Sequence, residues 1–166
     1  MISEITVSRA GIESVDDLRP VYLSIHDYYQ RIAPTIAGHP TRCPQDSWRL
    51  RRARYVGWLA EAGAFVARAD LGDSVIGYAI VSLGVGSQAW QTAEEVADLH
   101  DIAVLADYRN VGVGTRLLDC VEHELTEAGV SELRLNVIAA NVDARRLYER
   151  RGMTITAHTL LGRVRG

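Results

Sequence analysis

A chain of 166 residues with 48% apolar and 23% charged residues has the composition of a single globular domain, 1–166, and not of a disordered, collagen-like or disulfide-rich protein. A net charge of -3 argues against broad electrostatic binding of nucleic acid or of an anionic membrane surface. All 18 basic residues are arginines, so chemistry that needs a lysine, such as a Schiff base or a Walker phosphate loop, is excluded.

The first half of the chain predicts a strand, two helices and then a β-hairpin. The strands are indicated by alternating or continuous apolar residues, and the helices by apolar residues at a spacing of three and four. Asp46 or Ser47 is expected to cap the second helix, which follows a proline-rich loop. The expected ranges are 4–9 for the first strand, 13–30 and 46–62 for the helices, and 63–69 and 75–85 for the hairpin.

The second half predicts alternating strands and helices. A strand precedes two glycines and an amphipathic helix that ends at Gly129, and a second strand and helix follow before a terminal β segment. The whole order indicates one mixed α/β domain and not a series of alternating βα units. The expected ranges are 96–104 for the strand, 114–129 for the helix, 132–139 for the next strand, 141–152 for the last helix, and 153 onwards for the terminal β segment.

Compartment and metal content follow from simple counts. The N-terminal residues show no basic segment followed by an apolar stretch, and no apolar run approaches the ~20 residues that a membrane span needs. We therefore expect a cytoplasmic protein with no signal peptide and no membrane partner. Cys43 and Cys120 lie far apart without the spacing of metal ligands, so we expect neither a metal site nor a disulfide.

Four arginines mark one face of the predicted helix 46–62. A solvated helix face explains such a cluster, and so does a contact with an anion or a substrate; the sequence leaves both open. The four are Arg49, Arg51, Arg52 and Arg54.

The segment 109–115 forms a glycine-rich turn between strand 96–104 and the helix that follows. A turn at a helix start leaves several backbone N–H groups unpaired, and the helix dipole favours an anion there. Because Gly112 and Gly114 lack Cβ atoms, a pyrophosphate could approach the main chain closely. The spacing does not match a dinucleotide fingerprint, whose third glycine would fall at Leu117.

A second motif begins at Asn141, which is a good helix N-cap. Ala144 and Tyr148 follow three and seven positions later, along one stripe of the helix. The small side chain at 144 would leave a groove beside that stripe, with the phenol of Tyr148 at its far end.

Together, the motifs Arg109-x-x-Gly112-x-Gly114 and Asn141-x-x-Ala144-x-x-Leu147-Tyr148-Glu149-x-x-Gly152-Met153 resemble those of the Gcn5-related N-acetyltransferase (GNAT) superfamily. The resemblance covers residues 96–153 and implies an α+β mixed α/β fold. Its central mixed sheet would be mostly antiparallel, splayed at the cofactor site and flanked by about four helices. The sequence departs from the family's usual residues at three positions, Ala106, Asn110 and Met153, where many members have Pro, Gly and Phe.

The resemblance also implies that the protein uses acetyl-CoA as acyl donor and needs no metal. The glycine turn would hold the pyrophosphate, and the pantetheine arm would pair with the end of strand 96–104 like an added strand. Main-chain N–H groups near Ala103 would polarise the thioester carbonyl. The residues implied for acetyl-CoA are Ile102, Ala103, Val104, Arg109, Asn110, Val111, Gly112, Val113, Gly114, Thr115, Asn141 and Ala144.

The same resemblance implies catalytic roles. Tyr148 occupies the position of the family's general acid, which would protonate the departing thiolate. Asp98 and His100 stand where amine-acetylating members carry a catalytic Glu or His. A base helps because only about one part in 10³ of an ordinary alkyl amine is neutral at pH 7. Whether Asp98, His100, the neighbouring Asp101 or a bound water serves as that base stays open.

The acceptor would be a primary amine of a small molecule or a peptide, and no nucleic-acid partner is expected. Two alternatives remain: a non-catalytic acyl-CoA-binding module of the same fold, and a phosphate-binding protein that uses only the glycine turn. A homodimer, and an acyl group longer than acetyl, are also left open. Aromatic residues near the expected acceptor side are Tyr28, Tyr29, Trp48, Trp58 and Trp90.

Overall fold

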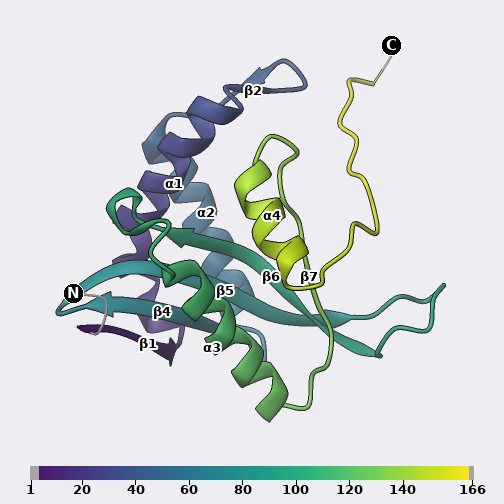
Figure 1. Cartoon of the computed structure of the whole chain (residues 1–166). Helices are drawn as coiled ribbons and strands as arrows, with labels where there is room; N and C mark the ends of the chain where they lie inside the picture. Colours follow the sequence, from purple (N-terminus) through teal and green to yellow (C-terminus); the bar gives the residue numbers. More distant parts are fainter. Residues whose placement is uncertain (1–3, 165–166) are drawn as a thin grey trace.

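The computed structural model describes residues 4–164 as one central sheet between two helical layers (Figure 1). Its strands are β1 (Ile5–Ala10), β4 (Phe65–Leu71), β5 (Ser74–Val85), β6 (Glu95–Val104) and β7 (Leu133–Leu135), with a separate small hairpin of β2 (Thr35–Ile36) and β3 (His39–Pro40). Its helices are α1 (Arg19–Ile32), α2 (Pro44–Leu59), α3 (Val113–Glu127) and α4 (Val142–Arg150), with 3₁₀ turns at Ile12–Leu18 and Ala106–Tyr108.

The central sheet has the order β1-β4-β5-β6-β7. Neighbouring strands are antiparallel except β6 and β7, which run parallel because the chain crosses over through α3 between them. The predicted fold class is therefore confirmed: a mixed, mostly antiparallel sheet of five strands with four helices around it.

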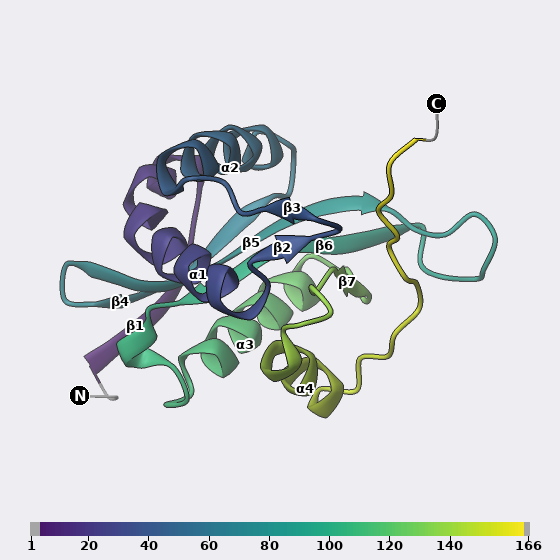
Figure 2. The ribbon, with the colours of Figure 1, turned by 90° about the horizontal axis from the view of Figure 1, so that it is seen from above.

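The two faces of the sheet carry different cores. We call the cluster under α3 and α4 the aliphatic core; it is built around buried residues such as Leu117 and Val121. The cluster under α1 and α2 is the aromatic core, with Tyr55 and Tyr78 fully buried. Figure 2 shows the sheet edge-on between these two layers. Strand β6 lies between both clusters and contributes side chains to each.

Strands β6 and β7 stay together for only three residue pairs, Ala97 with Leu133 to Leu99 with Leu135. Beyond Leu135 the chain leaves the sheet, and residues 136–138 have no regular structure. The second half of β6 therefore has no strand on its β7 side within the described part of the chain. This gap is the splay that the family resemblance implies.

Strand β6 contains a β-bulge at His100. Its neighbour β5 pairs Ile80 with Asp101 and Val81 with Leu99, so His100 has no partner of its own. Because side chains alternate across a strand, one extra residue reverses the alternation beyond it. His100 and Asp101 therefore both face the α1–α2 side of the sheet.

Two predicted elements have other bounds in the structure, and neither Asp46 nor Ser47 caps α2, whose N-cap is Cys43. Helix α2 begins at Pro44, and proline suits the first helical turn because it lacks an N–H. The Ser47 hydroxyl shares a hydrogen bond with the Tyr22 hydroxyl, and the two oxygens are 2.5 Å apart. The predicted strand 132–139 is reduced to β7.

Among residues 4–164, no helix has both the length and the apolar character for crossing a bilayer.

The predicted terminal β segment is wrong. Residues 153–164 form no strand and run away from the body of the molecule (Figure 1). Gly152 ends α4 with a left-handed φ of 82°, and the chain then departs from β7 without meeting a strand with which it could pair. Leu160 and Val164 are more than nine-tenths exposed as a result.

Candidate active site

The glycine turn between β6 and α3 presents a row of unused amides. The first i to i-4 hydrogen bond of α3 runs from Arg116 N–H to the Gly112 carbonyl. Among the described residues, none of the amides of 110–115 donates to another backbone carbonyl. Asn110 and Gly112 adopt left-handed conformations, with φ of 61° and 91°, which turn these amides outward. Asn tolerates such a φ better than most residues, which explains its place at 110.

Nothing fills the space that the glycines leave. A Cβ atom at Gly112 would meet no atom within 4 Å, and one at Gly114 would meet only Leu147, at 4.0 Å. The turn is therefore an open, positively polarised cradle at a helix N-terminus, the geometry that binds phosphate groups in other proteins. Acetyl-CoA carries such a pyrophosphate, and the cradle fits it.

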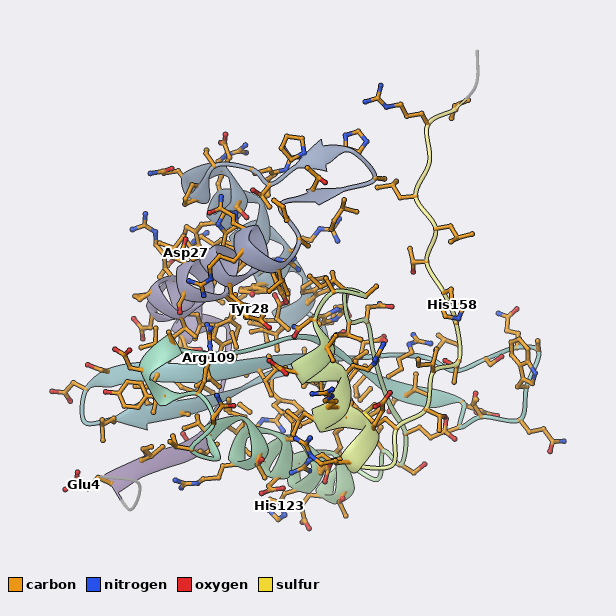
Figure 3. The ribbon with its side chains drawn as sticks, turned by 45° about the horizontal axis from the view of Figure 1, so that its top comes forward. Glu4, Asp27, Tyr28, Arg109, His123 and His158 are labelled. Carbon is orange, nitrogen blue, oxygen red and sulfur yellow. The ribbon has the colours of Figure 1, made fainter. Side chains whose placement is uncertain are left out.

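Arg109, which was expected to contact the cofactor, makes hydrogen bonds to other residues of the protein. Its guanidinium donates to the Val104 carbonyl at 2.9 Å and to Ser24 of α1 at 3.2 Å, and its own amide binds the Ala106 carbonyl. Burial and the nearby Arg31 lower the pKa of Arg109. Figure 3 shows Arg109 between the turn and α1, next to the ring of Tyr28, 5.2 Å from its guanidinium carbon.

This arrangement changes what Arg109 can do. The side chain ties α1 to the end of β6, and its guanidinium is hydrogen-bonded within the protein. Val104 belongs to the strand end that was expected to pair with pantetheine, and its carbonyl accepts a hydrogen bond from Arg109. Within the described chain, the amides of 110–115 are therefore the groups of the turn that stay free for an anion.

A narrow cavity of about 50 Å³ lies where β6 and β7 separate. Its walls are β6 on one side and the segment after β7 together with α4 on the other. Asn141 caps α4, its side-chain oxygen accepting from the Ala144 N–H at 3.2 Å, which confirms the predicted cap. Lining residues include Ile102, Asn141, Ala144 and Tyr148. The residues of the second motif are thus brought to the same gap as the end of β6.

Tyr148 is buried, and its ring is part of the aliphatic core while its side chain also lines the narrow cavity. Burial raises the pKa of Tyr148 well above its ordinary value, and the negative charge of Asp101 adds to the rise. The phenol therefore stays protonated at neutral pH and can donate a proton into the cavity.

A wider cavity of about 390 Å³ adjoins the narrow one on the α2 side of β6. The two cavities share Tyr29, His100 and Asp101 in their walls. Burial raises the pKa of Tyr29 to about 12, and the negative charge of Asp101 contributes to the rise. These three residues therefore lie where a molecule bound in one cavity would meet a molecule bound in the other.

Asp101 sits in a hydrogen-bonded group on the aromatic core. Its Oδ2 accepts from the Tyr55 hydroxyl at 2.5 Å and lies 3.5 Å from the Arg51 guanidinium. Tyr55 and Tyr78 share a further hydrogen bond of 2.7 Å. Burial raises the pKa of Asp101, while Arg51 and Tyr55 work in the opposite direction. Both contacts end on Oδ2, so within the described residues no hydrogen bond forms to Oδ1.

His100 lies flat against Trp58 of α2, with ring centres 3.6 Å apart and planes 4° from parallel. Its Nε2 shares a hydrogen bond of 2.7 Å with the Ser82 hydroxyl. Burial lowers the pKa of His100, although Asp98 and Glu61 oppose that effect. The imidazole is therefore neutral at pH 7 and able to accept a proton.

Asp98 shares the face of His100 but does not contact it. Its carboxylate is held by Arg134 on both oxygens, and Arg134 also donates to the Val85 carbonyl at 3.0 Å. Asp98 therefore forms an ion pair with β7.

From the sequence, Asp101 is only one of several possible bases, and the packing of Trp58 on His100 is not predicted. Apolar residues of β6 fall at 97 and 99 and then at 102 and 104, so the alternation changes phase at His100. That change is the signal for the bulge, and hence for Asp101 facing the acceptor side. Of the other aromatic candidates, Trp48 is in the aromatic core and Trp90 is 77% exposed on the β5–β6 loop.

The chain is similar in sequence to a protein family and in structure to solved proteins. The model of the Acetyltransferase (GNAT) family matches residues 24–153. No curated protein sequence matches the chain. A GCN5-related N-acetyltransferase from Ralstonia eutropha JMP134 has a TM-score of 0.73 at 14% identity, covering 95% of this chain and 97% of its own.

Two further solved structures name an activity. Aminoglycoside N-acetyltransferase AAC(6')-Iy in complex with a bisubstrate analogue, CoA-S-monomethyl-acetylneamine, has a TM-score of 0.66 at 18% identity, covering 98% of this chain and 99% of its own. A ribosomal-protein-alanine N-acetyltransferase from Brucella melitensis biovar Abortus 2308 has a TM-score of 0.62 at 17% identity, covering 96% and 99%. At these identities the likeness shows a shared fold.

Proposed function

The chain belongs to the GNAT acetyltransferase family, and from that premise we propose that it is an acetyl-CoA-dependent N-acetyltransferase acting on a primary amine. The observation that carries the proposal is the junction of two cavities at His100 and Asp101, one bordered by Tyr148 and the other open on the α2 side. A donor and an acceptor site that meet at titratable groups are what direct acyl transfer requires.

Acetyl-CoA, when bound, supplies an acetyl thioester that an amine can attack. We assign its pyrophosphate to the amides of 110–115, and its pantetheine arm to the unpaired edge of β6 at 102–103. The narrow cavity of about 50 Å³ borders that edge beside Ala144 and Asn141, and we assign the sulfur end of the arm to it. Backbone N–H groups on the free edge of β6 would orient the thioester carbonyl.

On the acceptor side we assign proton removal to His100. Its imidazole is neutral because burial lowers its pKa, and Trp58 fixes the plane of the ring. Asp101, with Oδ1 unused, would hold the amine in its ammonium form until the proton leaves. Asp98 is not needed for this role, because Arg134 neutralises it.

Tyr148 would donate its proton to the departing thiolate. A phenol that stays protonated at neutral pH can do so even though its pKa is above that of the thiol, because a hydrogen bond forms as charge develops on sulfur. The amine's proton and the phenol's proton then move on opposite sides of β6.

Free-thiol release with acetyl-CoA and a panel of primary amines tests this proposal. Tyr148→Phe should lower kcat about 10²-fold, the usual size of a general-acid contribution, with acetyl-CoA affinity unchanged. An unchanged rate in a folded Tyr148→Phe protein would remove Tyr148 from the mechanism. Thermal stabilisation by acetyl-CoA without thiol release for any amine would instead support the alternative, a non-catalytic acyl-CoA-binding module.

A further inference from the structure

The arginines of α2 divide into two pairs with different surroundings. Arg49 lies 3.5 Å from Asp46, and Arg52 lies 2.6 Å from Asp16, so both are paired away from the cavities. The other two, Arg51 and Arg54, line the wide cavity on the acceptor side of β6. The structure thereby resolves the alternative that the sequence left open: half of the cluster faces a site.

The charges around the wide cavity nearly cancel, with one exception. Arg134 is neutralised by Asp98, and Arg51 by Asp101. Arg54 is exposed and has no ion-pair partner in the part of the chain that the structure describes. Among the described charged residues that line the cavity, Arg54 is therefore the cation without an ion-pair partner, and its charge would disfavour a polycationic amine. The negative charge of Glu61 also acts on His100, from outside the lining of the cavity.

Arg54 also stands at a useful distance from the groups that would receive the amine. It is three residues beyond Arg51 on α2, so the two are neighbours on one helix face, with Cβ atoms about 5–6 Å apart. Arg51 contacts Asp101 directly, and the charge of Arg54 contributes to the lowered pKa of His100. A cation and a proton acceptor thus lie within the length of one small molecule.

We propose that the acceptor is a small amine that also carries an anionic group, with a free amino acid as the simplest example. Its ammonium group would lie at Asp101 Oδ1 and its anionic group at Arg54. A cavity of about 390 Å³ is of the size that holds small ligands. This inference rests on the proposed function, and it disfavours aminoglycosides, polyamines and peptide N-termini as acceptors.

Binding of reaction products tests the inference without the complication of amine ionisation. N-acetyl-leucine and its N-methylamide differ in the carboxylate alone, and calorimetry in the presence of CoA compares their affinities. We expect the carboxylate to bind at least about tenfold more tightly, as a charged hydrogen bond allows. Arg54→Gln should remove that preference, whereas Arg49→Gln, outside the cavity, should retain it.

Acetyl transfer supplies a second readout. Leucine should be a better acceptor than leucyl peptides or 1,4-diaminobutane, and Arg54→Glu should move the preference toward the diamine. O-phosphoethanolamine as the best acceptor would also support the proposal and identify the anion as a phosphate. Because Arg54 is exposed and unpaired, these variants are expected to fold.

The outcomes separate two kinds of failure. Efficient transfer to diamines or peptides, with Arg54→Gln unaffected, would overturn the inference and leave the proposed function standing. If no amine is acetylated, the proposed function fails. Equal affinity for N-acetyl-leucine and its N-methylamide would then overturn the inference as well, whereas a preference for the carboxylate would uphold an anion site at Arg54.

Discussion

The two faces of the sheet present different chemical groups to the proposed site. On the α3–α4 face, an aliphatic core supports a turn and a strand edge whose main-chain groups are left free, so the donor site is built mainly from backbone. On the α1–α2 face, an aromatic core carries hydroxyls, a buried carboxylate and arginines, so the acceptor site is built from side chains. Backbone geometry withstands substitution, whereas a side-chain site can change its partner with a few residues.

The largest expected effect is on the aliphatic face and concerns stability. Leu117 is fully buried in α3, and Leu117→Ala should lower the free energy of unfolding by about 2–5 kcal/mol through a cavity. Because the donor site is made of backbone, we expect little change in kcat per folded molecule below the new Tm. Chemical denaturation together with active-site titration would measure both quantities. A large loss of kcat would show that the two faces are not separable.

Asp101→Asn, on the aromatic face, should affect substrate binding more than stability. The amide can still accept a hydrogen bond from Tyr55, but Arg51 loses its charged partner and the site loses its negative charge. We expect KM for the amine to rise about tenfold, as loss of a charged contact does, with KM for acetyl-CoA unchanged. Steady-state kinetics with each substrate varied would check this. A rise in KM for acetyl-CoA alone would contradict the assignment of faces.

Gly114→Val tests the backbone site itself. A Cβ at 114 would meet only the Leu147 side chain, at the ordinary contact distance of 4.0 Å, so the fold should persist, but the new side chain would occupy the cradle that a pyrophosphate would need. Affinity for acetyl-CoA should fall about tenfold or more. Gly57→Val is the matched control, because a Cβ on Gly57 in α2 also meets nothing within 4 Å. Equal affinities in the two variants would place the anion elsewhere.

The smallest expected effect is a pH dependence from the acceptor face. The folded state lowers the pKa of His100, so the unfolded chain binds its proton first as the pH falls. The stabilising contribution is complete above the unfolded pKa of about 6.5 and is lost as the pH falls toward the folded value. Denaturant unfolding of wild type and His100→Gln between pH 5 and 8 should therefore show the difference in stability shrinking on acidification. A difference that is constant with pH would argue against a buried, neutral imidazole.

Much of the fold could be predicted because local patterns agreed with one another. The hairpin of β4 and β5, the glycine turn and the cap at Asn141 each carry a strong local signal, and each is present. The terminal β segment failed because alternation indicates that a segment can form a strand but not whether a neighbouring strand is there to pair with it. The fate of such a segment is decided by tertiary contacts.

Only part of the candidate site could be predicted from the sequence, for the same reason. Tyr148 and the glycine turn could be named from motifs, but the capture of Arg109 by Ser24 joins residues 85 positions apart. The stacking of Trp58 on His100 and the pairing of Asp98 with Arg134 also depend on long-range packing. Side-chain partners across the sheet leave little trace in the local sequence.

The bulge at His100 lets one face of β6 carry two consecutive side chains. In a regular strand only one of two consecutive side chains points to a given face, so without the extra residue the α1–α2 face would receive either His100 or Asp101 but not both. Removing His100, with no other change, would keep Asp101 on that face and Ile102 on the α3 side, and the later residues of the strand would keep their directions. The bulge therefore adds one functional side chain to the acceptor face and leaves the packing of the rest of the strand unchanged.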